Sequence, residues 1–203
     1  MDFRFNGWGG KFKAEHDNAA NKLLYATNLV RGHYVDALDF ELEGGGIESD
    51  GCGTLLTTAE CLLNPNRRRQ GDAVPTSDKA QVEALLKERL GVERILWLHH
   101  GYLAGDDTDS HIDTLARLCP NDTIIYVQCT DTADEHYEAL AAMEQELQAL
   151  KLIVEQYFAF AESQALAQRP MYMKDWIKRL DLILTMNEYT ILDHTGKVSH
   201  ALA

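Results

Sequence analysis

The chain is 203 residues long, 45% hydrophobic, and carries a formal net charge of −13 at pH 7. Its length and apolar content allow one buried core, or a domain with an appendage, whereas its acidity argues against binding to nucleic acid or to an anionic membrane surface. No apolar run reaches the roughly 18 residues of a membrane span, and the first residues form no apolar leader, so we expect a cytosolic protein.

The charge is unevenly distributed along the chain. Residues 152–203 contain six acidic and five basic residues, so residues 1–151 carry −12 of the total charge. This shift in composition predicts two segments of different origin.

Helices and strands are predicted to alternate over the first 150 residues. Apolar residues at helical spacing predict a helix over 15–30. After Gly32, residues 34–42 have an extended pattern that places Glu43 at the end of a strand. The apolar positions of the helix include Ala19, Leu23, Leu24 and Ala26.

A hairpin and a break follow this strand. Asp50-Gly51 lies between Ile47-Glu48-Ser49 and Thr54-Leu55-Leu56-Thr57, which predicts a hairpin with a two-residue turn. Asn64-Pro65-Asn66 then interrupts the chain.

Ser77 is the predicted N-cap of a helix that runs to Leu90, and Gly91 is its predicted C-terminal glycine. The apolar runs at 95–98 and 123–129 predict buried strands. The apolar positions of the helix are Val82, Leu85, Leu86 and Leu90.

The last part of the chain is predicted to be helical. A long helical pattern begins near Ala133, and a helix should end before Pro170, because proline cannot continue it. No strand is predicted after residue 150, so the predicted fold class is α/β followed by a helical tail. The helix after Pro170 is amphipathic, with an apolar face of Met173, Trp176, Ile177, Leu180 and Ile183 or Leu184.

His111 and its neighbours are the best candidates for chemistry. Histidine exchanges protons near neutral pH, and Asp113, two residues on in a segment expected to be extended, should point to the same face. Glu43, beside Gly44–Gly46, should approach that face closely because glycine has no side chain. Carboxylates accept the fixed N–H groups of a guanidinium, so these residues suit its binding and hydrolysis.

Other interpretations of these residues are open. The run Asp106-Asp107-Thr108-Asp109 is also typical of a solvated acidic loop or of a calcium-binding oxygen cluster. His99 and His100 with His111 match no common zinc spacing, and Gly44–Gly46 lack the spacing of a phosphate-binding loop. We therefore expect no metal and no nucleotide cofactor.

The four cysteines are too few and too irregularly spaced for a disulfide framework or a Cys-x-x-Cys zinc site. We expect reduced thiols that pack inside the fold. They are Cys52, Cys61, Cys119 and Cys129.

Five segments, together with Glu43-Gly44-Gly45-Gly46-Ile47 and Gly105–Asp113 inside them, resemble the agmatine deiminase and bacterial (Porphyromonas-type) peptidylarginine deiminase family. The resemblance covers about residues 1–151. It implies a partial pentein fold, which is a fragment of a five-bladed α/β-propeller, and hydrolysis of agmatine to N-carbamoylputrescine and ammonia, or of a peptide arginine. The segments are residues 5–11, 42–48, 53–58, 61–67 and 97–117.

The resemblance also implies roles for particular residues. In that family a cysteine thiolate attacks the guanidinium carbon, ammonia leaves, and water hydrolyses the covalent intermediate. Carried over by motif, His111 is the general acid/base, Glu43 is the acidic residue that supports the site, and Asp113 holds the guanidinium. Trp8, from the first matched segment, is assigned with Asp113 to substrate binding.

Two segments of the family are missing. The chain begins after an upstream Trp-x-Arg-Asp segment, and it lacks the C-terminal Gly-Gly-Gly-x-x-His-Cys segment that carries the nucleophile. The four cysteines stand at other positions, so no nucleophile is assigned. Because the covalent route needs an activated thiolate, we expect a truncated chain that is inactive alone.

The tail, about residues 152–203, resembles the C-terminal region of the RhuM-type virulence proteins in residues 157–162, 169–177 and 196–200. The two parts should join near Lys151. Three functions follow: a truncated deiminase for a small cationic guanidinium substrate, an oligomer in which a partner or second copy supplies the missing blades, or a non-enzymatic module that binds polyamines and makes contacts through its tail.

Overall fold

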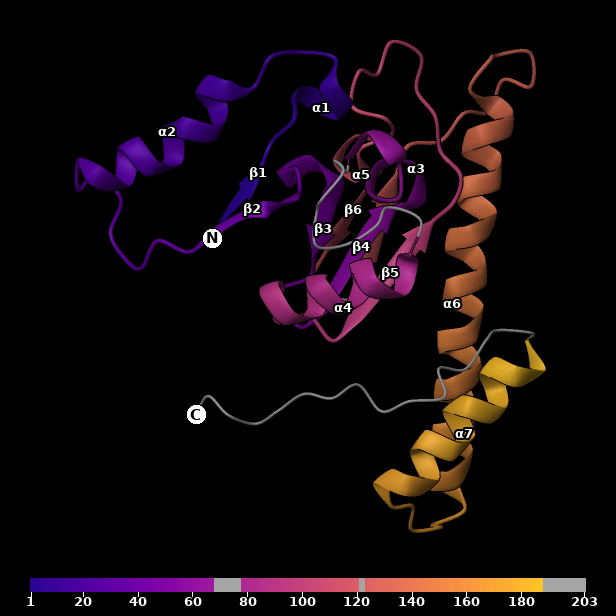
Figure 1. Cartoon of the computed structure of the whole chain (residues 1–203). Helices are drawn as coiled ribbons and strands as arrows, with labels where there is room; N and C mark the ends of the chain where they lie inside the picture. Colours follow the sequence, from indigo (N-terminus) through magenta and orange to yellow (C-terminus); the bar gives the residue numbers. More distant parts are fainter. Residues whose placement is uncertain (68–77, 121–122, 188–203) are drawn as a thin grey trace. The chain divides into compact units, whose positions relative to one another are not determined.

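The computed structural model describes residues 1–67, 78–120 and 123–187. The chain divides into two compact units, Met1–Glu146 and Leu147–Ala203, which are described separately. The first unit is mixed α/β and the second is helical, which confirms the coarse prediction of an α/β fold with a helical tail (Figure 1).

At the start of the chain, β1 (Asp2–Arg4) pairs in parallel with β2 (Asp36–Glu41). Between them lie α1 (Gly7–Gly10) and α2 (Glu15–Ala26). The predicted helix over 15–30 is right in its start and too long at its end, because the chain turns after Ala26 and Asn28 has a left-handed φ of 57°. No residue of α2 is buried.

The central sheet has three strands in the order β3-β4-β5. β3 and β4 form the predicted antiparallel hairpin, but residues 50–53 connect them, so the turn is longer than two residues. β4 is buried along its whole length and pairs in parallel with β5. The strands are β3 (Ile47–Ser49), β4 (Thr54–Thr58) and β5 (Arg94–Leu98).

The crossover from β4 to β5 carries the main core helix. It contains α3 (Ala59–Leu62), η2 (Pro65–Arg67) and α4 (Lys79–Leu90). The cap of α4 is Asp78, whose side chain accepts from the backbone N–H of Gln81; the predicted cap, Ser77, was one residue too early and lies outside the described residues. Gly91 ends α4 in the left-handed conformation, as predicted. One cluster of the hydrophobic core consists of Phe40, Leu42, Cys61, Leu62, Val82, Leu85 and Leu86.

A third sheet, of two strands, follows the short helix α5 (Ile112–Leu115). β6 (Ala116–Cys119) and β7 (Thr123–Tyr126) are antiparallel. The prediction of a buried strand over 123–129 was wrong in burial, since β7 is half-buried and Ile125 is 59% exposed. β6 was not predicted.

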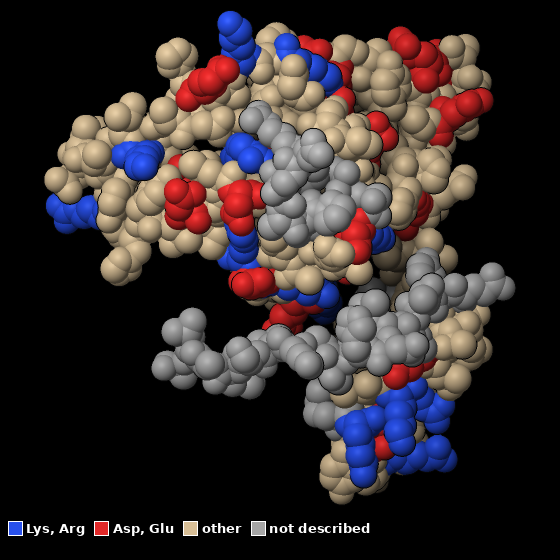
Figure 2. All heavy atoms as spheres, in the orientation of Figure 1, with Lys and Arg blue, Asp and Glu red and all other residues tan. Residues whose placement is uncertain are grey.

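The second unit contains the later part of α6 (Tyr137–Leu166) and α7 (Met173–Met186). α6 ends before Pro170, as predicted, and starts four residues after the predicted Ala133. The ring of Trp176 packs against Tyr157 and Phe160, with centroids 5.7 and 6.2 Å apart. Lys174, Lys178 and Arg179 lie on α7, where Figure 2 shows a group of basic side chains.

Among the helices that the structure describes, none combines the length and the apolarity of a membrane span.

Candidate functional site

Glu43 and His111 meet in the interior of the first unit. Glu43 follows β2 and precedes the 3₁₀ turn of Gly44–Gly46, whereas His111 immediately precedes α5. Glu43 Oε2 lies 2.5 Å from His111 Nε2, and the two side chains are 5% and 7% exposed. The chain thus brings together two of the predicted site residues that are 68 positions apart.

Gly45 allows the backbone after Glu43 to lie close to His111 and Asp113. A Cβ atom at this position would lie 2.5 Å from His111 Nδ1 and 2.7 Å from Asp113 Oδ2, which are overlaps. Glycine is therefore required here because the backbone packs directly against both side chains. Asp113 is exposed, so its carboxylate lies at the solvent side of this contact.

The expectation that residues 111–113 are extended was wrong. His111 itself has extended ψ, but Asp113 lies in the first turn of α5, and Thr114 Oγ1 donates to the carbonyl oxygen of His111. The two side chains still share a neighbour, Gly45, because the turn brings them to one backbone segment rather than because they alternate along a strand.

The acidic run before His111 is an ordered loop. Asp106 accepts hydrogen bonds from the backbone N–H groups of Thr108 and Ser110 and from the Thr108 hydroxyl. Burial raises the pKa of Asp106, but these hydrogen bonds outweigh it and lower that pKa below its usual range. Asp109 and Ser110 both have left-handed φ values, 59° and 60°, and such strain is typical of functional segments.

Arg67 is a residue of the site for which the sequence predicts no role. Its side chain is 2% exposed, and its Nη2 lies 3.0 Å from Glu43 Oε2. Nη1 donates to Asp109 Oδ2 at 2.7 Å, and Nη2 donates to the carbonyl oxygen of Thr108 at 2.7 Å. The only signal in the sequence was its place at the end of a matched segment, after the break at Asn64-Pro65-Asn66.

Asp109 is the second carboxylate that Arg67 contacts. Burial by itself raises the pKa of Asp109, but hydrogen bonds from Lys11, Asn66 and Arg67 hold it at about 2. Asp109 is therefore ionised at neutral pH, and it faces two cationic groups rather than a free cleft.

Cys61 is the thiol of this group. Its Sγ lies 3.9 Å from Arg67 Nη2, and burial raises the pKa of the thiol to about 12. Cys61 lies in the buried core cluster with Phe40 and Leu62, as predicted for a packing thiol, and the raised pKa disfavours the thiolate that a nucleophilic cysteine needs. Among the described residues, no other cysteine joins Glu43 and His111 in one cluster.

The same cluster has the donor types of a metal site. One ligand atom from each of Glu43, Cys61 and His111 lies within 4.8 Å of the others. A divalent ion there would meet the Arg67 guanidinium, already 3.0 Å from Glu43, and a protonated thiol. The positive charge of Arg67 and the protonated thiol therefore disfavour a metal ion beside Glu43.

His99 and His100 lie at a different place in the first unit. Their backbone N–H groups donate to the carboxylate of Glu146, and His100 Nδ1 lies 2.9 Å from Glu146 Oε1. Neither joins the cluster of Glu43, Cys61 and His111 among the residues that the structure describes.

Trp8 lies in an aromatic cluster. Its ring makes edge contacts with Phe5 and Phe12, at centroid distances of 5.4 and 5.6 Å. The adjacent Gly9 packs against Arg67, since a Cβ there would lie 2.6 Å from Nη1. The role of Trp8 in substrate binding stays a prediction.

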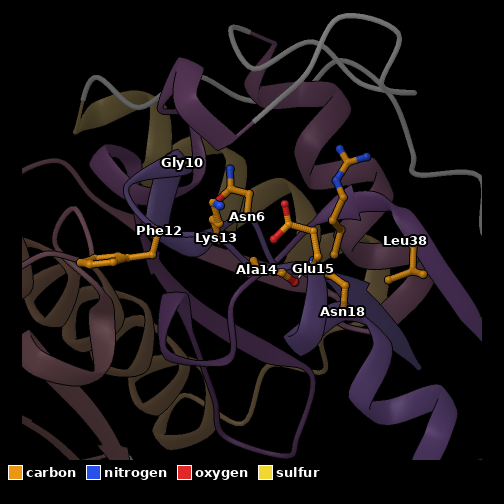
Figure 3. Close-up of a pocket in the computed structure, with 9 residues that line it drawn as sticks. Asn6, Gly10, Phe12, Lys13, Ala14, Glu15, Asn18 and Leu38 are labelled. Carbon is orange, nitrogen blue, oxygen red and sulfur yellow. Dashed lines mark hydrogen bonds between the residues drawn. The ribbon is translucent and has the colours of Figure 1, made fainter.

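A half-open cavity of about 470 Å³ lies beside this aromatic cluster. Figure 3 shows Asn6, Lys13 and Glu15 among its lining residues, with Phe12 at one side. Asn6 Nδ2 donates to Glu41 Oε2 and to the carbonyl oxygen of Asn66, so the cavity wall is linked to the segment that carries Arg67.

Two family profiles match the chain. That of the Porphyromonas-type peptidyl-arginine deiminases matches residues 1–170. That of the virulence protein RhuM family matches residues 140–203, which agrees with the resemblance of the tail.

Individual proteins show the same likeness. The agmatine deiminase of Stutzerimonas stutzeri (strain A1501) is 37% identical over 140 residues, which cover 68% of this chain and 36% of that protein. A structure of C. jejuni agmatine deiminase with substrate bound is 43% identical, with a TM-score of 0.65, over 73% of this chain and 42% of that one. A structure of an agmatine deiminase of Enterococcus faecalis is 32% identical, with a TM-score of 0.58, over 72% of this chain and 39% of that one. The chain thus spans about two fifths of the length of these relatives.

Proposed function

The chain belongs to the Porphyromonas-type peptidyl-arginine deiminase family, and from that premise we propose that its first unit binds the guanidinium group of a small cationic substrate such as agmatine. The names of its relatives support agmatine as the probe to test first. The overall acidity of the chain favours the approach of a cation.

One observation carries this proposal. Glu43 Oε2 is engaged by His111 and Arg67, whereas Oε1 is buried and accepts no hydrogen bond from any described residue. A buried carboxylate oxygen without a donor is unfavourable, and a guanidinium N–H supplies a charge-assisted donor of the right kind. Glu43 Oε1 is therefore the atom that we expect the substrate to satisfy.

The other residues have complementary roles in this proposal. In a site that also contained a thiolate, His111, held by Glu43, would protonate the departing amino group, which leaves as ammonia, and would then activate water. Asp113, which reaches solvent beside Gly45, accepts from the opposite side of the guanidinium. Nucleophilic attack needs a thiolate that Cys61 does not provide, so we propose that this chain alone binds its substrate without turning it over.

The proposal extends to the architecture. We propose that the first unit is a fragment of the pentein propeller, and that the deiminase-like segment gives way to the RhuM-like tail near Lys151, within α6. Limited tryptic digestion of the full chain, followed by mass spectrometry, should then yield a stable fragment that ends close to Lys151. A protected fragment that extends through Arg169 would contradict this boundary.

A second candidate is that a partner or a second copy completes the active site. It is supported by the apolar residues that α2 and the following turn leave exposed, since Leu23 is 65% and Leu29 is 74% exposed. Sedimentation velocity should then detect an oligomer, and an ammonia assay should show that this oligomer hydrolyses agmatine. A monomer at all concentrations would argue against a second copy, and binding without ammonia release would favour a binding module.

Isothermal titration with agmatine tests the main proposal. Agmatine should bind, and putrescine, which has an amine in place of the guanidinium, should bind at least tenfold more weakly. Glu43→Gln, which keeps the shape and removes the charge, should abolish this preference. Equal binding of agmatine and putrescine, or of agmatine to wild type and Glu43→Gln, would show that Glu43 does not recognise a guanidinium.

A further inference from the structure

Arg67 joins the two segments that carry Glu43 and His111. We propose that Arg67 is a positioning residue, which holds the Glu43 carboxylate so that Oε2 faces His111 and Oε1 is left for the substrate. The inference rests on the proposed function, in which Glu43 Oε1 meets the guanidinium, and it assigns a role to a residue outside the predicted site.

Arg67 and His111 share one oxygen of the Glu43 carboxylate. Glu43 Oε2 accepts from Arg67 Nη2 at 3.0 Å and lies 2.5 Å from His111 Nε2. Two donors on the same oxygen restrict rotation of the carboxylate about its terminal bond. Because both donors lie on the side of Oε2, the orientation of Oε1 is determined by Arg67 as well as by His111.

The Arg67 guanidinium also binds the loop that precedes His111. Nη1 contacts Asp109 Oδ2, and Nη2 also donates to the carbonyl oxygen of Thr108. These residues lie two and three positions before His111. Arg67 therefore sets the distance between Glu43 and the segment that places the imidazole.

An arginine, and not a lysine, is needed at position 67. A planar guanidinium presents several donors in fixed directions, whereas an ammonium is a compact point charge. Here Nη1 and Nη2 serve different segments, and Gly9 packs so closely on Nη1 that a Cβ would lie 2.6 Å from it. Lysine keeps the charge and cannot make these contacts together.

Arg67 is not itself the group that meets the substrate. Its side chain is only 2% exposed and lies among Glu43, Asp109 and backbone oxygens of its own chain. Its action is on the orientation of Glu43, so its loss should change both ligand affinity and the environment of the His111 ring.

The experiment compares wild type, Arg67→Lys and the matched control Arg89→Lys in the full chain. Arg89 makes a bidentate pair with Asp39 on the surface of the first unit, so its replacement removes the same type of contact away from His111. Two readouts are used: agmatine affinity by calorimetry, and the ring ¹⁵N resonances of His111 in histidine-labelled protein, assigned with His111→Gln.

We expect Arg67→Lys to bind agmatine at least tenfold more weakly and to shift the His111 ring resonances, while Arg89→Lys changes neither and circular dichroism of both variants stays native. Unchanged affinity and unchanged His111 resonances in Arg67→Lys would overturn the proposal, as would equal shifts in Arg89→Lys. If wild type binds no agmatine, the proposed function fails, and the His111 resonances still decide the role of Arg67.

A second variant covers the case in which Arg67→Lys does not fold. Asp109→Asn leaves Arg67 in place and removes the charge of one of the two carboxylates with which it forms an ion pair. It should shift the His111 resonances in the same direction by a smaller amount and weaken agmatine binding severalfold. His111 resonances identical to those of wild type would overturn the proposal in this case.

Discussion

The two units of the chain differ in how far their charged side chains are buried, although both expose some apolar residues. In the first unit, Glu43, Arg67 and His111 are almost fully buried, and Glu43 Oε2 contacts both Arg67 and His111. In the second, apolar residues such as Leu166 and Met186 are 79% and 76% exposed, and Lys178 lies on the surface of α7. Burying charge is costly unless it is paired, so the first unit retains an arrangement that packing alone would not select.

The largest expected effect is the removal of the buried cation. Arg67→Met leaves Glu43 and Asp109 without their shared partner, and breaking a buried pair costs about 3–5 kcal/mol. Urea unfolding should show this loss. The comparison is Arg179→Met in the second unit, where the guanidinium lies 4.9 Å from the Phe160 ring centroid and its loss should cost only about 0.5–1 kcal/mol. Equal losses would erase the contrast between the units.

The next effect concerns the contact of the glycine turn with the site. Gly45→Ala should force His111 or Asp113 to move, because its Cβ would lie 2.5 Å from Nδ1, and agmatine affinity should fall at least tenfold. Overpacking of this kind also destabilises by about 1–3 kcal/mol. Gly44→Ala is the matched control, since no atom lies within 4 Å of the corresponding Cβ. If both variants bind alike, the packing of Gly45 is irrelevant to recognition.

A smaller effect should appear in acid. The pKa of Asp109 is held at about 2, below its ordinary 3.8, so the ionised carboxylate contributes stability that is complete above about pH 4 and is lost as the pH falls toward about 2. We expect roughly 2 kcal/mol from this group. Urea unfolding at pH 5 and pH 2.5 should show that the free energy of unfolding depends less on pH in Asp109→Asn than in wild type. Asp107→Asn, at an exposed neighbour, should keep the pH dependence of wild type.

The smallest effect is one of reactivity. Because burial raises the pKa of Cys61 to about 12, only roughly one thiol in ten thousand is a thiolate at pH 8. Iodoacetamide followed by mass spectrometry should therefore modify the exposed Cys52 and leave Cys61 intact in the native protein. Fast labelling of Cys61 would mean that it can act as a nucleophile, and would remove the main reason to expect binding without turnover.

Several features of the chain follow from short-range patterns. Three of them were predicted correctly because each depends on the backbone preferences of a few adjacent residues. They are the hairpin at Asp50-Gly51, the end of α4 at Gly91 and the end of α6 before Pro170. Errors arose where neighbours distant in sequence decide the outcome. The predicted strand over 123–129 is apolar, yet β7 lies at an exposed edge, and an apolar run does not reveal which strands will cover it.

The sequence by itself determined the family, the mixed α/β character with a helical tail, and the candidates Glu43, His111 and Asp113, because ordered motifs and local periodicity are properties of the chain. Only the tertiary structure decided that Gly45 packs directly against His111 and that Arg67 holds Glu43 to the loop ending in Asp109. These contacts join residues 24 to 66 positions apart. The physical reason is that a buried ionic network depends on which segments the fold brings together, and no local preference encodes that choice.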